Sequence, residues 1–255
     1  DLLAWVADRA VAFAAAAAEP IAAVGVVVPE VVDPSGELRS STTVAWRRAD
    51  LVGAFEAIAP VDVGNDVEAA AYAEARFGAG VGRRSVGFVT VGTGISSSLV
   101  LDGVPWAGAH GAAQLLGSAP ISLDCPRCGE RLRVCLEEVA SGPGIAARFG
   151  AAAASAEEVF ALAATGDTDA AAHLAATAEV LGSFLAFFVN LVDPEILVLG
   201  GGLGSVGGRF FDDVVAAARS HIWAEHVRGI DIAPAALGAK AQVVGAAVRA
   251  LGRAA

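Results

Sequence analysis

Short runs of β-branched residues alternate with longer alanine-rich stretches along this chain of 255 residues. The short runs predict strands, because a strand that is buried on both faces reads as a continuous apolar segment. The alanine-rich stretches have the length and the apolar spacing of helices. This alternation predicts an α/β fold whose sheets are mostly parallel.

The expected elements can be placed by residue number. Strands are predicted over residues 24–28, 61–63, 85–91, 95–101, 194–199 and 229–233, with 85–91 and 95–101 forming a hairpin. Helices are predicted over residues 2–19, 50–59, 67–77, 136–140, 146–149, 156–165, 170–191, 210–224 and 242–254. Residues 108–135 are rich in glycine, proline and cysteine and are predicted to be irregular.

The net charge of −11 limits the partners of this chain. Such a surface repels nucleic-acid phosphate, so these residues are not expected to bind DNA themselves. No apolar run reaches the length of about 20 residues that a bilayer requires. The first residues lack the pattern of a secretory signal, so we expect a cytoplasmic protein without a membrane anchor. The chain begins at Asp1 and contains no methionine, which predicts that further sequence lies upstream.

Three polar or glycine-rich segments follow predicted strands, where ligands bind in α/β folds. They are Asn65-Asp66, Gly92-Thr93-Gly94 and Gly200-Gly201-Gly202. Glycine lets the backbone approach a phosphate closely, so the second and third segments are candidates for nucleotide contacts. A tight hairpin turn explains the second segment equally well, and a plain strand-to-helix turn explains the third.

Asp66 is the candidate catalytic acid of the chain. A carboxylate at a strand end could accept a proton from a substrate hydroxyl while Asn65 orients the substrate. The alternative is that Asp66 caps the following helix and Asn65 belongs to the turn. Glu137 is a second candidate, although a glutamate in the first turn of a helix is also favoured by the helix dipole.

Three cysteines lie within eleven residues, at positions 125, 128 and 135. A clustered, odd set of cysteines in a cytosolic chain favours metal ligands over disulfides. Cys125, Cys128 and Cys135 therefore predict a structural zinc site, for which Asp124 or water could supply the fourth ligand.

Taken together and in this order, the motifs resemble those of the ROK family, which contains bacterial sugar kinases and sugar-responsive transcriptional repressors. The segments that carry the resemblance are residues 61–70, 91–95, 108–117, 135–142, 193–202 and 237–247. The resemblance implies a two-lobed ribonuclease-H-like fold of the actin and hexokinase type. Central mixed sheets would be flanked by helices, and the first strands of the N-terminal lobe would be missing. Residues 1–76 and 238–255 would form the small lobe, and residues 77–237 the large lobe with a zinc-knuckle insert at 118–135.

The resemblance also implies roles for individual residues. Asp66 would be the base toward a sugar 6-hydroxyl, and Asn65, Glu137 and His110 would contact the sugar. His110 could equally be an ordinary surface histidine. The turn from Gly92 to Gly94 would meet the phosphates of ATP, and the one from Gly200 to Gly202 would face the adenosine.

Departures from the family pattern weaken the expected sugar site. Where the family has Gly-Glu-x-Gly-His, this chain has Gln114-Leu115-Leu116-Gly117-Ser118, so leucine and serine replace a glutamate and a histidine. Each lost hydrogen bond to a charged group costs roughly 1.5–3 kcal/mol. The Asp-x-Gly-Gly-Thr phosphate loop of the family is also absent, since the chain begins in the helix that follows it.

These departures favour a sugar-responsive transcriptional regulator whose effector part keeps a decayed kinase site. It would bind a sugar or sugar phosphate, form a dimer or tetramer, and contact DNA only through an upstream segment. The alternative is an ATP-dependent, glucokinase-like sugar kinase, which would use ATP and Mg²⁺ to phosphorylate a hexose 6-hydroxyl.

Overall fold

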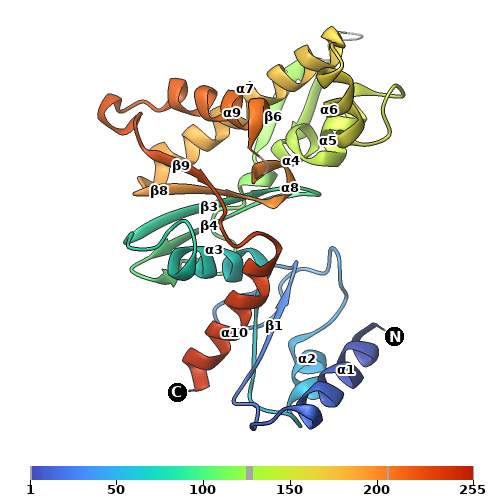
Figure 1. The fold of residues 1–255 in the computed structure, drawn as a ribbon, viewed down its shortest axis with the longest axis vertical. Helices are drawn as coiled ribbons and strands as arrows, with labels where there is room; N and C mark the ends of the chain where they lie inside the picture. Colours follow the sequence, from blue (N-terminus) through green and yellow to red (C-terminus); the bar gives the residue numbers. More distant parts are fainter. Residues whose placement is uncertain (1, 125–128, 206, 255) are drawn as a thin grey trace.

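A computed structural model describes residues 2–124, 129–205 and 207–254 of the chain. Figure 1 shows two lobes, one above the other, with the N-terminal segment in the lower lobe. The α/β fold with mixed sheets and flanking helices that the resemblance implied is confirmed, whereas the sheets are not mostly parallel, because antiparallel pairings are as common as parallel ones among the described strands.

The larger sheet contains five strands in the order β5-β4-β3-β8-β9. They are β3 (Ser85–Val91), β4 (Ile95–Leu101), β5 (Val104–Pro105), β8 (Ile196–Gly200) and β9 (Asp231–Pro234). β3, β8 and β9 run parallel to one another, whereas β4 pairs antiparallel with both of its neighbours, β3 and β5, so the sheet is mixed. The predicted hairpin of β3 and β4 is confirmed.

Helices cover both faces of this sheet. On one face, α7 (Thr168–Val192) and α9 (Gly208–His221) enclose a core around Leu185, Leu197 and Leu199. On the other face, α3 (Asp66–Phe77) and α10 (Ala241–Ala254) pack over Val86, Phe88 and other apolar side chains. The sheet is therefore buried on both sides, as its continuous apolar strands predicted.

The second sheet has two parallel strands, β1 (Val24–Val28) and β2 (Val61–Asn65). It lies against α10, while α1 (Leu2–Ala16) and α2 (Arg48–Phe55) belong to the same lower lobe. α3 and α10 thus lie side by side at the junction of the two lobes (Figure 1). β2 extends two residues beyond the predicted 61–63, because its pairing with β1 continues to Asn65.

The prediction that residues 108–135 are irregular is wrong in part. A 3₁₀ turn covers Leu116–Ser118, and an antiparallel pair joins β6 (Pro120–Asp124) to β7 (Arg131–Cys135). Apolar residues alternate with polar ones in both strands, so that Ile121 lies opposite Val134 and Leu123 opposite Leu132. These cross-strand apolar pairs stabilise the hairpin despite the surrounding glycines.

The remaining helices follow the hairpin. They are α4 (Leu136–Ala140), α5 (Gly142–Phe149), α6 (Ala156–Ala164) and the short α8 (Gly201–Gly204). Within the part of the chain that the structure describes, α7 alone is long and apolar enough to cross a membrane by length and composition. A core helix passes the same test, and α7 packs its buried residues against the sheet and α9.

Candidate functional site

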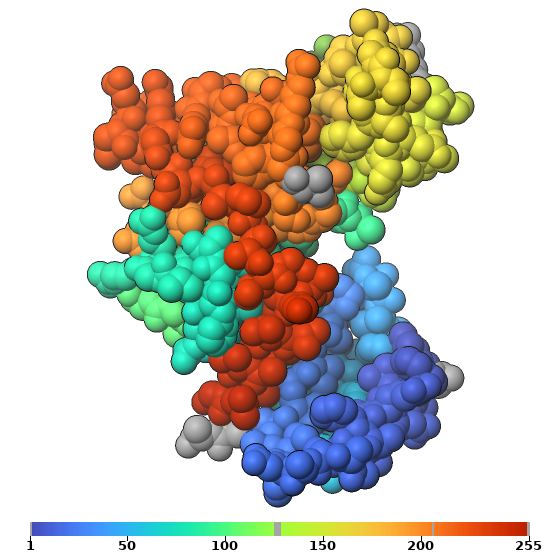
Figure 2. Space-filling view, in the orientation of Figure 1, coloured from blue at the N-terminus to red at the C-terminus, as the bar shows by residue number. Residues whose placement is uncertain are grey.

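A cavity of about 1640 Å³ opens where the two lobes meet. Its walls come from the end of β2 and the start of α3, the turn between β3 and β4, the helices α4 to α9, and the first turn of α10. Figure 2 shows a hollow on this side of the molecule, between the yellow-green helices above and the blue segment below. The cavity lies at the carboxyl ends of strands, where ligands bind in α/β folds.

Most of the residues that the sequence singled out line this cavity. They are Asn65, Asp66, Gly92, Thr93, Gly94, Glu137, Gly201 and Gly202. Gly200 does not line it, because it is the last residue of β8 and lies under the ring of Phe88. The three strand-end segments therefore surround one space, although they are far apart in the sequence.

Asn65, rather than Asp66, caps α3. Its Oδ1 accepts hydrogen bonds from the backbone N–H groups of Val67 and Glu68, both at 2.9 Å. Its Nδ2 donates to the backbone oxygen of Glu30 at 3.0 Å. The alternative in which Asp66 caps the helix is thus wrong, because the asparagine amide already occupies the first-turn donors.

Asp66 is therefore not the helix cap, and it lines the cavity. Burial raises its pKa above the ordinary value for aspartate, and hydrogen bonds from its own backbone N–H and that of Val67 only partly oppose this rise. The Nε2 of Gln242 donates to Oδ2 of Asp66 at 3.1 Å. A carboxylate with a raised pKa binds a proton more readily, as a general base requires.

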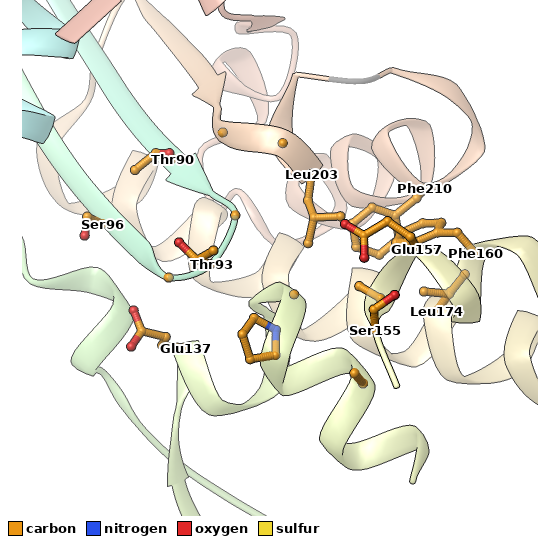
Figure 3. Close-up of a pocket in the computed structure, with 18 of the residues that line it drawn as sticks. Thr90, Thr93, Ser96, Glu137, Ser155, Glu157, Phe160, Leu174, Leu203 and Phe210 are labelled. Atoms are coloured by element: carbon orange, nitrogen blue, oxygen red, sulfur yellow. The ribbon is translucent and has the colours of Figure 1, made fainter. Parts of the chain in front are cut away.

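Glu137 lies in the first turn of α4, below the turn between β3 and β4 (Figure 3). Its Oε2 accepts a hydrogen bond from the backbone N–H of Ile95 at 2.8 Å. Glu137 therefore occupies the position that the helix dipole favours, and it also lines the cavity. The contact ties the start of α4 to the glycine turn.

The glycine turns lie against each other and against α5. The backbone oxygen of Gly92 accepts a hydrogen bond from Gly142 at 2.7 Å, and Ser141 caps α5 by accepting from Gly144 at 3.1 Å. Gly201 has a φ of +79°, and a Cβ at this position would lie 2.3 Å from the backbone oxygen of Val91. Only glycine fits this close approach of the two turns without strain.

An apolar slot forms the far end of the cavity, and sequence reasoning missed it. Phe160 and Phe210 meet edge to face with ring centroids 5.2 Å apart, and Leu174 and Leu203 line the same end (Figure 3). Arg209 and Asp213 lie at its rim, 3.6 Å apart. In the sequence, this apolar end is indicated only by the apolar faces of the predicted helices over 156–165 and 210–224. Packing in the core explains such faces equally well.

Other predicted site residues lie elsewhere. His110 lines a separate cavity of about 460 Å³ with Asp33 and Arg39, because its loop lies against the segment after β1. Leu115 and Ser118 are exposed and do not line the main cavity. The structure therefore does not bring these three residues to the Asp66 end of the site.

The zinc prediction rests mainly on residues outside the described part of the chain. Cys125 and Cys128 fall there, whereas Cys135 is half-buried at the start of α4. Among the described residues, no group of three or more histidine, cysteine, aspartate or glutamate side chains could hold a metal ion. The zinc site stays a prediction.

Glu30 holds the loop that closes one side of the cavity. The residue is 2% exposed, and its carboxylate accepts hydrogen bonds from the Ser40 hydroxyl and from three consecutive backbone N–H groups, those of Thr42, Thr43 and Val44. Burial alone would raise the pKa of Glu30, but these hydrogen bonds outweigh it and lower the pKa from 4.5 to about 2. Thr43 and Pro29 line the cavity, so Glu30 shapes its wall.

We expect Glu30→Gln to reduce the free energy of unfolding at pH 7 by about 1–3 kcal/mol, because an amide leaves buried donors without an acceptor. The pKa of Glu30 is lower in the folded chain than in the unfolded one, so its contribution is complete above pH 4.5 and is lost as the pH falls toward 2. Urea unfolding at pH 7 and pH 3 measures both effects. Glu37→Gln, on the exposed part of the same loop, is the control. Equal losses for both variants would contradict the prediction.

Comparisons with known proteins agree with this geometry. A family model described as ROK family matches residues 3–253. The chain is 41% identical over 191 residues to the bifunctional enzyme NanE/NanK of Brucella melitensis, a match that covers 74% of this chain and 35% of that protein. The chain thus spans about a third of the length of this relative.

Solved structures share the fold. A ROK family glucokinase from Streptomyces griseus, in complex with glucose and AMPPNP, superposes with a TM-score of 0.77 at 27% identity and covers 96% of this chain and 87% of its own. A ROK family transcriptional regulator, a homologue of the E. coli MLC protein, has a TM-score of 0.73 at 24% identity over 100% of this chain and 69% of its own. The similarity to the transcriptional regulator shows a shared fold alone.

Proposed function

The chain belongs to the ROK family, and on that basis we propose that it is an ATP-dependent sugar kinase. The substrate would be a neutral hexose or an N-acetylhexosamine, and the product its phosphate ester. The observation that carries this proposal is the shared cavity, which Asp66 lines together with Asn65, Glu137 and two glycine turns.

The proposed chemistry needs one base and a site that holds two substrates in line. Asp66 would take the proton of the sugar hydroxyl as that oxygen forms its bond to the γ-phosphorus of ATP. The bond between the γ-phosphorus and the bridging oxygen would break, and ADP would leave with the electron pair. Since phosphoryl transfer relies on positioning more than on covalent chemistry, a cavity that holds both substrates supplies much of the catalysis.

The two ends of the cavity fit the two substrates. Asn65, Asp66 and Glu137 supply polar groups at one end, as hydroxyl recognition requires. The glycine turns offer backbone N–H groups in the middle, where phosphates would lie. The apolar slot around Phe160 and Phe210 suits a nucleotide base, whose faces pack well on aromatic and aliphatic side chains.

ATP normally reacts as its Mg²⁺ complex, and the metal would neutralise the negative charge that the phosphates carry. Mg²⁺ is usually held by the phosphates together with one or two carboxylates, not by a closed protein cage. Since the described residues include no cluster of three acidic, histidine or cysteine side chains, we assign no protein ligand set.

The regulator that the sequence favoured is the second candidate. Its support is the exposure of Leu115 and Ser118, which stand where the family pattern has two polar sugar ligands. The comparisons support the kinase more than the regulator, because the Brucella melitensis relative is named as an enzyme and the Streptomyces griseus structure as a glucokinase, whereas the regulator is similar in fold alone. The lobe boundaries and a homo-oligomer stay predictions.

A turnover assay separates the two candidates. The purified protein is mixed with ATP, Mg²⁺ and a panel of hexoses and N-acetylhexosamines, and ADP release is followed with a coupled enzyme assay. We expect sugar-dependent ADP release with at least one member of the panel, and a sugar phosphate detectable by mass spectrometry. Sugar binding by calorimetry without any ADP release would favour the regulator instead.

A further inference from the structure

The helices α3 and α10 touch at a point that leaves no room for a side chain. Gly245 of α10 lies against Ala69 of α3, and a Cβ on Gly245 would stand 1.9 Å from the backbone oxygen of Ala69. Two helices can approach this closely only where one of them lacks a Cβ. The crossing point of the pair is therefore determined by one glycine.

This crossing brings Gln242 to Asp66. Gln242 is three residues before Gly245, and Asp66 is three residues before Ala69, so each lies one turn back on the same face of its helix. The Nε2 of Gln242 accordingly lies 3.1 Å from Oδ2 of Asp66, although 176 residues separate them in the sequence. Both side chains line the main cavity.

Buried ion pairs hold the two helices in this register. Arg249 of α10 lies 3.5 Å from Glu68 of α3 and 3.2 Å from Asp62 of β2, and all three side chains are less than one-fifth exposed. Arg253 adds a contact of 2.7 Å to Asp62. Sliding of α10 along α3 would break these pairs, so the amide of Gln242 stays within reach of Asp66.

We propose that Gln242 is a positioning residue for Asp66, which it holds by one carboxylate oxygen so that the other can accept the proton of the substrate hydroxyl. The inference rests on the proposed kinase function. The backbone N–H groups of Asp66 and Val67 also donate to this carboxyl group, and Gln242 adds a donor from a second helix. A fixed orientation is what a general base needs. A neutral amide donor fixes the orientation without neutralising the base.

The other charged groups around Asp66 are already engaged. Glu68 on its own helix and Asp62 on β2 pair with Arg249 and Arg253 of α10, and Glu137 on α4 bonds to Ile95. From α10, the Nε2 of Gln242 donates a hydrogen bond to the carboxyl group of Asp66. Removing its N–H group should therefore raise the pKa of Asp66, because a donor stabilises the ionised form.

The test replaces the amide by a side chain of similar length that cannot donate, Gln242→Met. A hydrogen bond to a charged group corresponds to roughly a 10- to 150-fold effect, so we expect kcat to fall at least tenfold. The KM for the sugar should change little, and the acid limb of the kcat profile should move to higher pH. Val243→Met, at an adjacent position that is 71% exposed, is the matched control and should behave as the wild type.

A second measurement does not depend on activity. The side-chain carboxyl carbon of Asp66 is titrated by NMR in the wild type and in Gln242→Met, with Asp66→Asn identifying the signal. A higher pKa in Gln242→Met supports the inference, and identical titrations together with an unchanged kcat profile overturn it. If the wild type phosphorylates no sugar, the proposed function fails, and the titration alone decides whether Gln242 holds Asp66.

Discussion

Asp66→Asn is expected to lower kcat for sugar phosphorylation by about 10²–10⁴-fold, the usual contribution of a general base. Asparagine has the size of aspartate but cannot accept the hydroxyl proton at any pH near neutrality. Asn65 caps α3 without help from Asp66, so the substitution should leave the helix and the fold intact. The KM for the sugar should change far less than kcat, since the loss concerns the transition state.

The coupled assay at saturating ATP measures this effect, and urea unfolding checks that stability is retained. Asp212→Asn, an exposed substitution of the same kind on α9, should keep wild-type activity. Retention of more than a tenth of the wild-type kcat by Asp66→Asn would exclude Asp66 as the base.

The pH dependence of activity follows from the same residue, because the base must be ionised to act. An aspartate with the ordinary pKa of 3.8 would lose activity only as the pH approaches that value. Because the pKa of Asp66 is raised, we expect the activity to begin to decline at a higher pH.

Gly201→Ala is the substitution with the second large expected effect. The φ of +79° at Gly201 costs a non-glycine residue roughly 1–2 kcal/mol. The added Cβ would also lie 2.3 Å from the oxygen of Val91 and 2.7 Å from the hydroxyl of Thr90, and such overpacking typically costs about 1–3 kcal/mol. We therefore expect the free energy of unfolding to fall by about 2–5 kcal/mol.

The same change should weaken nucleotide binding, because the chain can relieve the overlap only by moving the two glycine turns apart. We expect the KM for ATP to rise at least tenfold, measured in the coupled assay, while calorimetric sugar binding stays closer to the wild type. Gly202→Ala is the stability control, since a Cβ there meets no atom within 4 Å. A Gly201→Ala protein as stable as Gly202→Ala would refute the steric argument.

Most of the fold could be predicted from the sequence, because its signals are local. The apolar runs of β3 and β8 and the alanine-rich pattern of α7 reflect burial that repeats with the period of each element. The hairpin β6–β7 was missed because glycine, proline and cysteine obscured a weak alternation of apolar and polar residues. The alternative in which Asp66 caps α3 named the wrong neighbour, since both Asn65 and Asp66 are good capping residues.

Some residues of the site could likewise be predicted from the sequence, and others could not. Asn65, Asp66 and the glycine turns could be found because they directly follow strands, and strand ends meet at one edge of a sheet. Phe160, Phe210 and Gln242 could not be found, because nothing in their neighbours distinguishes them from ordinary helix residues. His110 was misplaced because the path of a long loop does not follow from its composition.

The sequence by itself determined which segments become strands and helices and which of them end in polar or glycine residues. Only the tertiary structure decided that Asp66 faces a cavity and that Gln242, 176 residues away, holds it. The physical reason is the contact of Gly245 with Ala69, because a helix crossing depends on the shapes of two surfaces at once. The residue pattern of one segment predicts which of its faces is buried, but not which other segment packs against that face.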